Sequence, residues 1–355
     1  MAPVTTSAAE ARVAFIQSQP DVLWQARLNP SLQGGRLQRL LGVPADYPRT
    51  FAAAVEAGDV QKYEPTNPNV ELPVSFDAAE HWPECASLIT TIRDQSDCGC
   101  CWAFAAAECA SDHMCIASEG SIKVPLSAQD MCFCGSVVDG KSDGCGGGRP
   151  NEAWAWIKSN GLVSGGQHGD TDTPFCSSYS LPKCHHHGPV GADPYPAENT
   201  TGCPEHTAAN TPMCPTACDA NAKAPHNVFA DDKYSFKGDI VTPEAGNVTQ
   251  IMQLIYEAGP VEAVFLVSAD FEQYSSGIYH HVTGAGLGFH AVKIVGWGVE
   301  NGTDYWKVAN SWNKYWGEDG FFRIRKGCEE EYLEYQVIAP GPGAIWGPMK
   351  SMLSQ

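Results

Sequence analysis

The stretch Gln95-Ser96-Asp97-Cys98-Gly99-Cys100-Cys101-Trp102 leads directly into an Ala-rich segment, residues 102–115, that is predicted to be a buried helix. A thiol at a helix N-terminus has its thiolate stabilised by the positive end of the helix dipole. This lowers the pKa of the thiol and makes it nucleophilic at modest pH. Cys101 stands at that position, so it is the candidate nucleophile.

Two polar residues far along the chain complete a catalytic set. His290 lies in Gly288-Phe289-His290-Ala291, which opens a predicted strand, and Asn310 closes the next strand. An imidazole would hold the thiolate as an ion pair and later protonate the leaving amine, while an amide fixes the ring. Gln95 and the backbone amide of Cys101 would donate to the developing oxyanion. The sequence therefore predicts a Cys-His-Asn mechanism assisted by Gln95.

The spacing of these residues is informative. Papain and cathepsin sequences carry C-G-[SA]-C-[WY], with His and Asn about 130 to 150 residues downstream. Here Cys100 stands where that signature has Ser or Ala, and His290 and Asn310 lie 189 and 209 residues after Cys101. An insertion is therefore required, and the cysteine-rich stretch 176–218 can supply it.

Length, charge and hydropathy limit the classes of protein. The 355 residues exceed one typical core, so two lobes or an appended segment are expected. The formal charge of −19 argues against a nucleic-acid partner, and it suits solubility or service in an acidic compartment. No apolar run approaches the ~18 residues of a membrane-spanning helix, so no membrane span is predicted.

Fifteen cysteines, all beyond residue 71, indicate an oxidising compartment. Three glycosylation sequons, at Asn199, Asn247 and Asn301, fit the same secretory history. The amino end lacks the apolar core of a secretory signal, so we expect that a signal was removed or that Met1 is not native. The expected location is a lysosome or another acidic endocytic compartment, or the outside of the cell.

Local patterns predict helices first and strands later. Helices are expected over residues 23–41, 102–115, 151–160 and 247–258, with a further one capped by Ser127. Strands are expected over residues 261–267, 290–296, 305–309 and 320–325. The polar, Pro-bearing connection at residues 63–68 is a predicted site of proteolytic cutting. The fold class is therefore α+β, with two lobes that could enclose a cleft.

With these motifs in view, the chain resembles the cathepsin B group of papain-type cysteine proteases over nearly its whole length. The matching stretches are residues 72–77, 98–108, 161–166, 259–262, 296–303 and 308–312. The resemblance implies a papain-like fold, with a helical left lobe, a β-barrel-like right lobe and the active site in the cleft between them.

The same resemblance implies how the chain is organised and what it acts on. Residues 1–71 would be an inhibitory propeptide, in which Trp24-Gln25-Ala26 matches the family, and residues 72–355 the peptidase domain. Peptides and proteins would be the substrates, the chain's own propeptide an intramolecular inhibitor, and cystatin-type proteins further inhibitors. No cofactor and no metal are expected.

Residues 184–203 resemble the occluding loop that makes cathepsin B release carboxy-terminal dipeptides. His186 and His187 match the family's pair, while His185 takes the place of an acidic residue. We expect His186 to form an exposed pair with Asp94, which would leave His187 to bind a substrate carboxylate. The connection 188–202 is longer than in the family and lacks its latching arginine, so a loop held away from the cleft, or a solvated or metal-binding tract, stays open as an alternative.

Further binding residues follow from the resemblance. Gly147 and Gly148 would present backbone to an extended substrate, and Trp312 would line the leaving-group side. Glu334 would form an acidic floor that accepts arginine, unless it is a solvent-exposed neighbour of the Glu329-Glu330-Glu331 run.

The resemblance also implies five disulfides. They are Cys85 with Cys115, Cys98 with Cys145, Cys134 with Cys214, Cys176 with Cys218, and Cys184 with Cys203. Parity permits two more bridges among Cys100, Cys109, Cys132 and Cys328, and Cys109 with Cys132 is the pair that we expect.

Two other functions are considered. Cys98 and Cys101 form a C-x-x-C pattern, as in thiol redox proteins. No strand precedes Cys98, however, and a redox role leaves His290 and Asn310 unused. An inactive homologue that only binds peptides is the other alternative, although such chains commonly lose the nucleophile.

Overall fold

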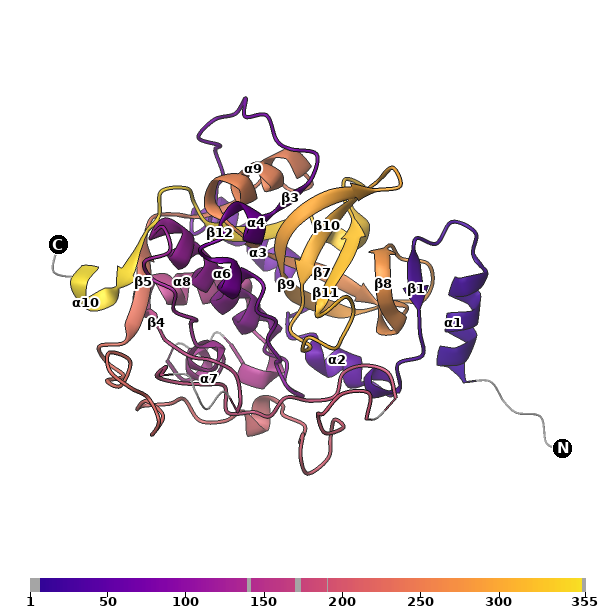
Figure 1. The fold of residues 1–355 in the computed structure, drawn as a ribbon, viewed down its shortest axis with the longest axis horizontal. Helices are drawn as coiled ribbons and strands as arrows, with labels where there is room; N and C mark the ends of the chain where they lie inside the picture. Colours follow the sequence, from indigo (N-terminus) through magenta and orange to yellow (C-terminus); the bar gives the residue numbers. More distant parts are fainter. Residues whose placement is uncertain (1–6, 139–141, 170–173, 190, 353–355) are drawn as a thin grey trace.

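The computed structural model describes residues 7–138, 142–169, 174–189 and 191–352. Buried side chains form two hydrophobic cores, one among helices and one around a large sheet. Figure 1 shows these two parts side by side, with α6 (Cys101–Ala117) between α8 (Pro150–Asn160) and the sheet. The described residues therefore have the two-lobed α+β arrangement that the sequence predicts.

In the helical lobe, helices begin and end close to the residues that the sequence predicts. The helix α6 packs against α7 (Ala128–Val138) and α8, which ends at Gly161. The backbone N–H of Asp130 donates to Ser127 Oγ at 3.1 Å, which is the N-cap that the sequence predicts. In α9 (Val248–Ala258), Asn247 Oδ1 caps the first turn in the same way.

The large sheet has the strand order β1-β8-β11-β10-β9-β7-β12-β6-β2, with β3 paired to β9. Its strands are β1 (Trp24–Ala26), β2 (Gln61–Lys62), β3 (Phe76–Asp77), β6 (Ile240–Thr242), β7 (Val261–Ser268), β8 (Tyr274–Tyr279), β9 (Gly286–Glu300), β10 (Thr303–Ala309), β11 (Phe321–Arg325) and β12 (Gln336–Pro340). Within the described residues β1 and β2 end the order without pairing to each other, so the expected barrel does not close. The four predicted strands correspond to β7, β9, β10 and β11.

Shorter elements complete the fold. A second sheet has the order β13-β5-β4, from β13 (Ile345–Pro348), β5 (Lys233–Lys237) and β4 (Leu162–Val163). Short helices are α4 (Ala78–His81), α5 (Ala86–Ile89) and α10 (Met349–Met352). Among the described residues, no helix combines the length and the apolar character needed to cross a membrane.

The leading segment differs from its prediction. A continuous helix over residues 23–41 is wrong: β1 is followed by a short 3-10 turn at Pro30–Leu32, and only α2 (Arg36–Leu40) is α-helical. Pro30 lacks a backbone N–H, and Gly34 and Gly35 have φ of 68° and 85°, which an L-residue in a right-handed helix does not adopt. Two further helices, α1 (Ala8–Ser18) and α3 (Tyr47–Ala57), were not predicted.

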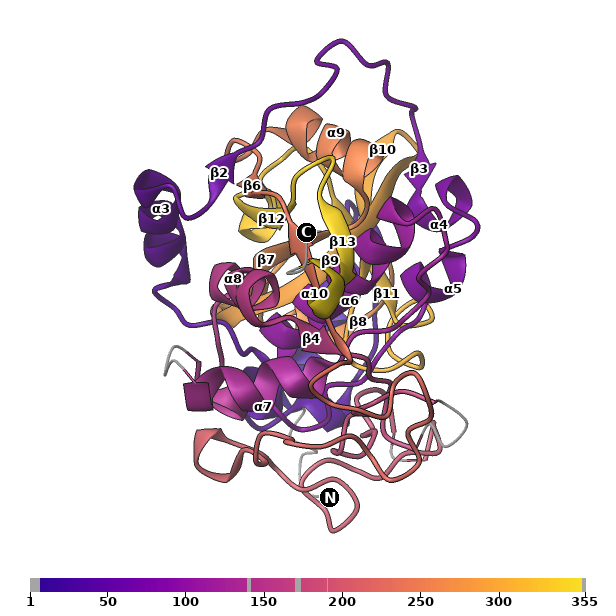
Figure 2. The ribbon, with the colours of Figure 1, turned by 90° about the vertical axis from the view of Figure 1, so that its left-hand side faces the viewer.

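This leading segment wraps around the rest of the chain. Its strand β1 pairs antiparallel with β8 at one end of the sheet, and its strand β2 pairs parallel with β6 at the other. Figure 2 shows α3 and β2 along one side, and the exposed connection from β2 to β3 arching over the molecule. Trp24 and Leu40 enter the core of the sheet, and Tyr47 and Phe51 enter the helical core. The segment therefore depends on the rest of the protein for its packing.

Candidate active site

The candidate nucleophile and its base come from opposite lobes. Cys101 is the first residue of α6, and His290 lies on β9, against which α6 packs. The backbone N–H of Ala291, the residue after His290, lies beside the Cys101 thiol and favours its thiolate. The imidazole Nε2 of His290 lies 2.8 Å from Asn310 Oδ1, just beyond the end of β10. The fold thus brings together the Cys-His-Asn set that the sequence predicts.

Gln95 lies in the same site with its amide held in one orientation. Its Nε2 donates to the carbonyl oxygens of Leu40 at 2.9 Å and Cys98 at 2.8 Å. Ser311 Oγ donates to Gln95 Oε1 at 2.6 Å, and Tyr179 OH donates to the Gln95 carbonyl at 2.9 Å. Neither of these supporting residues was predicted. Ser311 is adjacent to Asn310 in the sequence, whereas nothing in the sequence pointed to Tyr179.

The leading segment occupies the cleft as an extended peptide would. The backbone N–H of Gly42 donates to Cys101 Sγ at 3.2 Å, and the N–H of Gly148 donates to the Gly42 carbonyl at 2.9 Å. The N–H of Val43 donates to the Phe289 carbonyl at 3.3 Å. A Cβ on Gly147 would lie 2.7 Å from the Gly42 oxygen, so this position needs glycine. Gly147 and Gly148 therefore lie along the backbone of the leading segment, and their contact with a substrate stays a prediction.

The leading segment covers Cys101 and His290 and changes the pKa of both side chains. Burial raises the pKa of the Cys101 thiol to about 12 and lowers the pKa of His290 to about 4. The helix N-terminus by itself would lower the pKa of the Cys101 thiol, but the charged forms of both groups lose their water beneath the leading segment, and this effect is larger. In this state the pair is a neutral thiol and a neutral imidazole.

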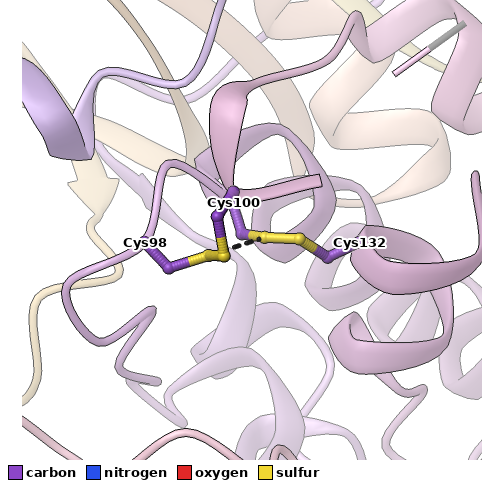
Figure 3. Close-up of side chains that lie close together, drawn as sticks. Cys98, Cys100 and Cys132 are labelled. Atoms are coloured by element: carbon purple, nitrogen blue, oxygen red, sulfur yellow. Dashed lines mark hydrogen bonds between the residues drawn. A yellow bond between two sulfur atoms is a disulfide. The ribbon is translucent and has the colours of Figure 1, made fainter. Parts of the chain in front are cut away.

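The cysteine pairing confirms five predicted bridges and corrects one. A sixth bridge joins Cys100 to Cys132, so the expected pair of Cys109 with Cys132 is wrong. Cys100 caps the start of α6 and faces α7, whereas Cys109 is buried and unbridged. Figure 3 shows the Cys98 sulfur next to Cys100, with the two sulfurs 3.1 Å apart.

Among the described residues, three cysteines carry no bridge: Cys101, Cys109 and Cys328. Cys98 is bound to Cys145, so it forms no dithiol with Cys101. The redox alternative therefore finds no support in this arrangement.

The loop at residues 184–203 holds His186 between two acids. Its Nε2 lies 3.0 Å from Asp94 Oδ1, as expected, and its Nδ1 lies 2.5 Å from Glu198 Oε1. The pair is buried, so the expected surface exposure is wrong. Burial alone would lower the pKa of His186, but Asp94 and Glu198 outweigh it and raise that pKa to about 10. Glu198 was not identified from the sequence.

His187 lies less deeply, with 19% of its side chain exposed and its Nδ1 3.2 Å from Asp193 Oδ2. Burial lowers its pKa in spite of the opposing effect of Asp193. The ring of His187 stacks on Tyr315, with centroids 6.0 Å apart.

Trp312 and Glu334 are the two other predicted binding residues, and both are buried. Trp312 is buried, and its ring centroid lies 4.9 Å from that of His290. Glu334 is only 2% exposed, and its Oε1 accepts from Trp306 Nε1 at 2.8 Å and from the Gly327 N–H at 2.7 Å. Glu334 therefore presents no free carboxylate to a substrate, and it is not the solvent-exposed residue of the alternative either.

The sequon asparagines differ in accessibility. Asn199 and Asn301 are exposed, and Asn247 is partly buried while it caps α9. Their glycosylation stays a prediction.

Comparisons with known proteins agree with this geometry. The family described as papain family cysteine protease matches residues 72–340. A cathepsin B-like cysteine proteinase 5 of Caenorhabditis elegans is 45% identical over 274 residues, which cover 76% of this chain and 75% of the relative. A cathepsin B-like cysteine proteinase 4 of the same organism is 39% identical and covers 96% of this chain and 94% of its own length.

A solved proenzyme has the same arrangement over most of the chain. ProCathepsin B S9 from Trypanosoma congolense superposes with a TM-score of 0.71 at 30% identity, over 94% of this chain and 98% of that one. Digestive procathepsin L 3 of Tenebrio molitor, at 19% identity and a TM-score of 0.60, shares the fold. The chain belongs to the papain family of cysteine proteases, in its cathepsin B-like group, and it is made as a zymogen.

Proposed function

We propose that Cys101, His290, Asn310 and Gln95 hydrolyse peptide bonds once the segment before about Leu72 has left the cleft. The observation that supports this most strongly is the Leu40 carbonyl, which accepts from Gln95 Nε2 while the neighbouring Gly42 lies on Cys101 Sγ. A peptide carbonyl already rests on the proposed oxyanion donor, next to the proposed nucleophile. A substrate would place its scissile carbonyl there.

The proposed steps follow from this placement. The Cys101 thiolate adds to the carbonyl carbon, and the oxyanion accepts from Gln95 Nε2 and the Cys101 N–H. The His290 imidazolium gives its proton to the leaving amine, which releases one product and leaves a thioester on Cys101. A water molecule, deprotonated by His290, then hydrolyses the thioester. Asn310 keeps the imidazole oriented throughout, by the hydrogen bond to Nε2.

We further propose that the loop at residues 184–203 gives the enzyme dipeptide-releasing activity beside internal cleavage. The buried contacts of His186 with Asp94 and Glu198 support a loop fastened to the body of the enzyme. His187, close to that anchor and partly exposed, would meet the carboxylate end of a substrate. Internal cleavage requires that this loop moves aside.

The setting of the enzyme is part of the proposal. An acidic endocytic compartment or secretion suits the charge of −19 and the six bridges, and cystatin-type inhibitors would compete for the cleft that the propeptide fills.

The test uses the processed enzyme and two substrates, one that releases a carboxy-terminal dipeptide and one that is cut internally. Both activities are expected, and a thiol alkylator should abolish both. Loss of Asn310 or Gln95 should lower kcat by about 10² to 10³ with a smaller effect on KM. Hydrolysis that survives alkylation of Cys101 would overturn the assignment.

A further inference from the structure

In the loop at residues 184–203, the side chains of His185, His187 and Asp193 lie close together but form no hydrogen bonds with one another. His185 Nδ1 lies 3.0 Å from Asp193 Oδ1, and His187 Nδ1 lies 3.2 Å from Asp193 Oδ2. Neither ring nitrogen makes a hydrogen bond, and Asp193 Oδ2 accepts none. Buried polar groups are normally paired, so this set requires an explanation.

The contacts of His185 indicate which of its ring nitrogens carries a proton. Its Nε2 lies 3.2 Å from the Gly188 carbonyl oxygen, which can only accept, so Nε2 carries the proton. In the neutral ring, Nδ1 then has a lone pair that faces a carboxylate oxygen, and both groups are fully buried. Two acceptors at this distance repel each other unless a second proton on the ring or a metal ion lies between them, and the contact lacks the geometry of an N–H···O hydrogen bond.

The alignment of these groups, and not their spacing, favours an ion over a shared proton. Ligand atoms about 2.0 to 2.2 Å from a tetrahedral zinc ion stand roughly 3.3 to 3.6 Å apart. The two measured separations, which end on different oxygens of Asp193, are slightly shorter than this. The three donor atoms all lie within 4.8 Å of one another. The nitrogens are near the oxygens yet badly aligned for hydrogen bonds, as expected when each lone pair points at a common centre.

We propose that His185, His187 and Asp193 bind one divalent transition-metal ion of the Zn²⁺ type. Two imidazoles and one carboxylate are a ligand set that Zn²⁺ favours, and the hydrogen bond from His185 Nε2 to Gly188 orients its ring as metal-bound histidines commonly are. Three protein ligands leave a fourth position for water or a carboxylate. This departs from the expectation of no metal drawn from the sequence. The site shares His187 with the proposed dipeptide release, but it is tested by metal binding and not by activity.

The ion would fasten the middle of the loop to its beginning. The bridge between Cys184 and Cys203 already joins the two ends. A metal that joins His185 and His187 to Asp193 would close the intervening connection, which is the part that is longer than in the family. The stacking of His187 on Tyr315 would then be held as well.

Metal binding is measured on the full-length Cys101→Ala chain, with its disulfides intact and after treatment with a chelator. This variant stays unprocessed and removes the active-site thiol as a competing ligand. Titration calorimetry with Zn²⁺ alone should give one site per chain, and the ion should raise the melting temperature. X-ray absorption at the zinc edge should show nitrogen and oxygen ligands and no sulfur.

Variants test the residues. His185→Ala with His187→Ala should abolish binding, and Asp193→Asn should weaken it at least about tenfold while its side-chain oxygen still accepts from the Tyr195 N–H. The control is His168→Ala, an exposed histidine elsewhere, which should bind as the parent does. No binding to the parent, sulfur ligands, or undiminished binding by Asp193→Asn would each overturn the site. The absorption measurement needs no variant, so it decides the matter even if a loop variant fails to fold.

Discussion

Cys100 and Cys101 are neighbouring thiols with different surroundings. Cys101 faces the cleft without a bridge, while Cys100 is bonded to Cys132 beneath it. Substitution of Cys101 should therefore affect catalysis, and substitution of Cys100 should affect the stability of the fold.

Cys101→Ala should abolish hydrolysis by the processed enzyme, because no other free thiol among the described residues lies beside Ala291 and His290. Cys100→Ser, made with Cys132→Ser so that no stray thiol remains, should keep most of kcat/KM. It should lose about 2 to 4 kcal/mol of stability, read from denaturant unfolding. Equal loss of activity in both enzymes would mean that the nucleophile is assigned wrongly.

The catalytic pair also predicts how pH acts on the zymogen. His290 has a pKa of about 4 beneath the propeptide, against about 6.5 for a free imidazole, so the released state binds more protons between these values. Acid below about 6.5 therefore favours release. In the released enzyme the helix N-terminus lowers the pKa of Cys101 below the value of about 12 that it has beneath the propeptide, so rising pH also favours release.

The His290 contribution thus holds the propeptide best above about pH 6.5, and each unit below this, down to about pH 4, weakens it by up to about tenfold. The initial rate of Cys101 alkylation in the intact chain, followed by mass spectrometry, should rise as the pH falls through this range. His290→Gln should remove the rise on the acid side. An acid-side rise that persists in this variant would show that other groups control release.

At the scale of elements, the loop at residues 184–203 depends on one buried histidine. His186→Ala would leave Asp94 and Glu198 facing each other without a cation, which for a buried pair costs about 3 to 5 kcal/mol. We expect the loop to open, so that internal cleavage rises and dipeptide release falls. The ratio of the two activities is the measurement.

Glu198→Gln serves as the matched variant, because it keeps the Asp94 contact and should give an intermediate ratio. An unchanged ratio in His186→Ala would mean that the loop does not control the cleft, and the proposed dipeptide release would be withdrawn.

The turn after α2 sets how the propeptide crosses the nucleophile. A Cβ on Gly42 would collide with the backbone carbonyl of Gly99, so Gly42→Ala should push this segment out of the cleft. The intact zymogen should then show peptidase activity at neutral pH and faster alkylation of Cys101. Gln38→Ala, an exposed change in α2, is the control and should stay inactive. A Gly42→Ala zymogen as inactive as the parent would contradict inhibition by a propeptide that crosses Cys101 at Gly42.

Elements with local signals could be predicted from the sequence. Ser127 caps its helix as expected, because a cap needs only a side chain three residues from the N–H that it accepts, and Asn247, predicted as the first residue of its helix, turns out to be the cap. Trp24 belongs to a strand only because β8 offers an edge more than 200 residues away, and no local pattern contains that information. Glu198 likewise reaches His186 through the path of a long loop. Glu334 was misplaced because resemblance transfers an alignment and not the direction of a side chain.

At the scale of the whole molecule, the contacts of the propeptide in the cleft predict an inactive zymogen. The intact chain should be nearly inactive at neutral pH, and cutting within the connection at residues 63–68, of which Tyr63 is buried, or near Leu72 should restore activity. Residues 7–71 form no core of their own, since their buried apolar side chains complete the two cores of the enzyme, so the propeptide should dissociate once it is cut and weakened by acid. Activity assays before and after limited proteolysis test this. Full activity of the uncut chain at neutral pH would refute it, and the boundary at residue 72 is read from the new N-terminus.

The pairing of β1 and β2 at the two ends of the sheet has a consequence for the life of the protein. When the leading segment departs, β8 and β6 become edge strands with unsatisfied backbone donors and acceptors, the kind of surface on which chains aggregate. β6 spans three residues and offers little, but β8 spans six. Until it is cut away, the inhibitor therefore also covers the two strand edges on which another chain could pair.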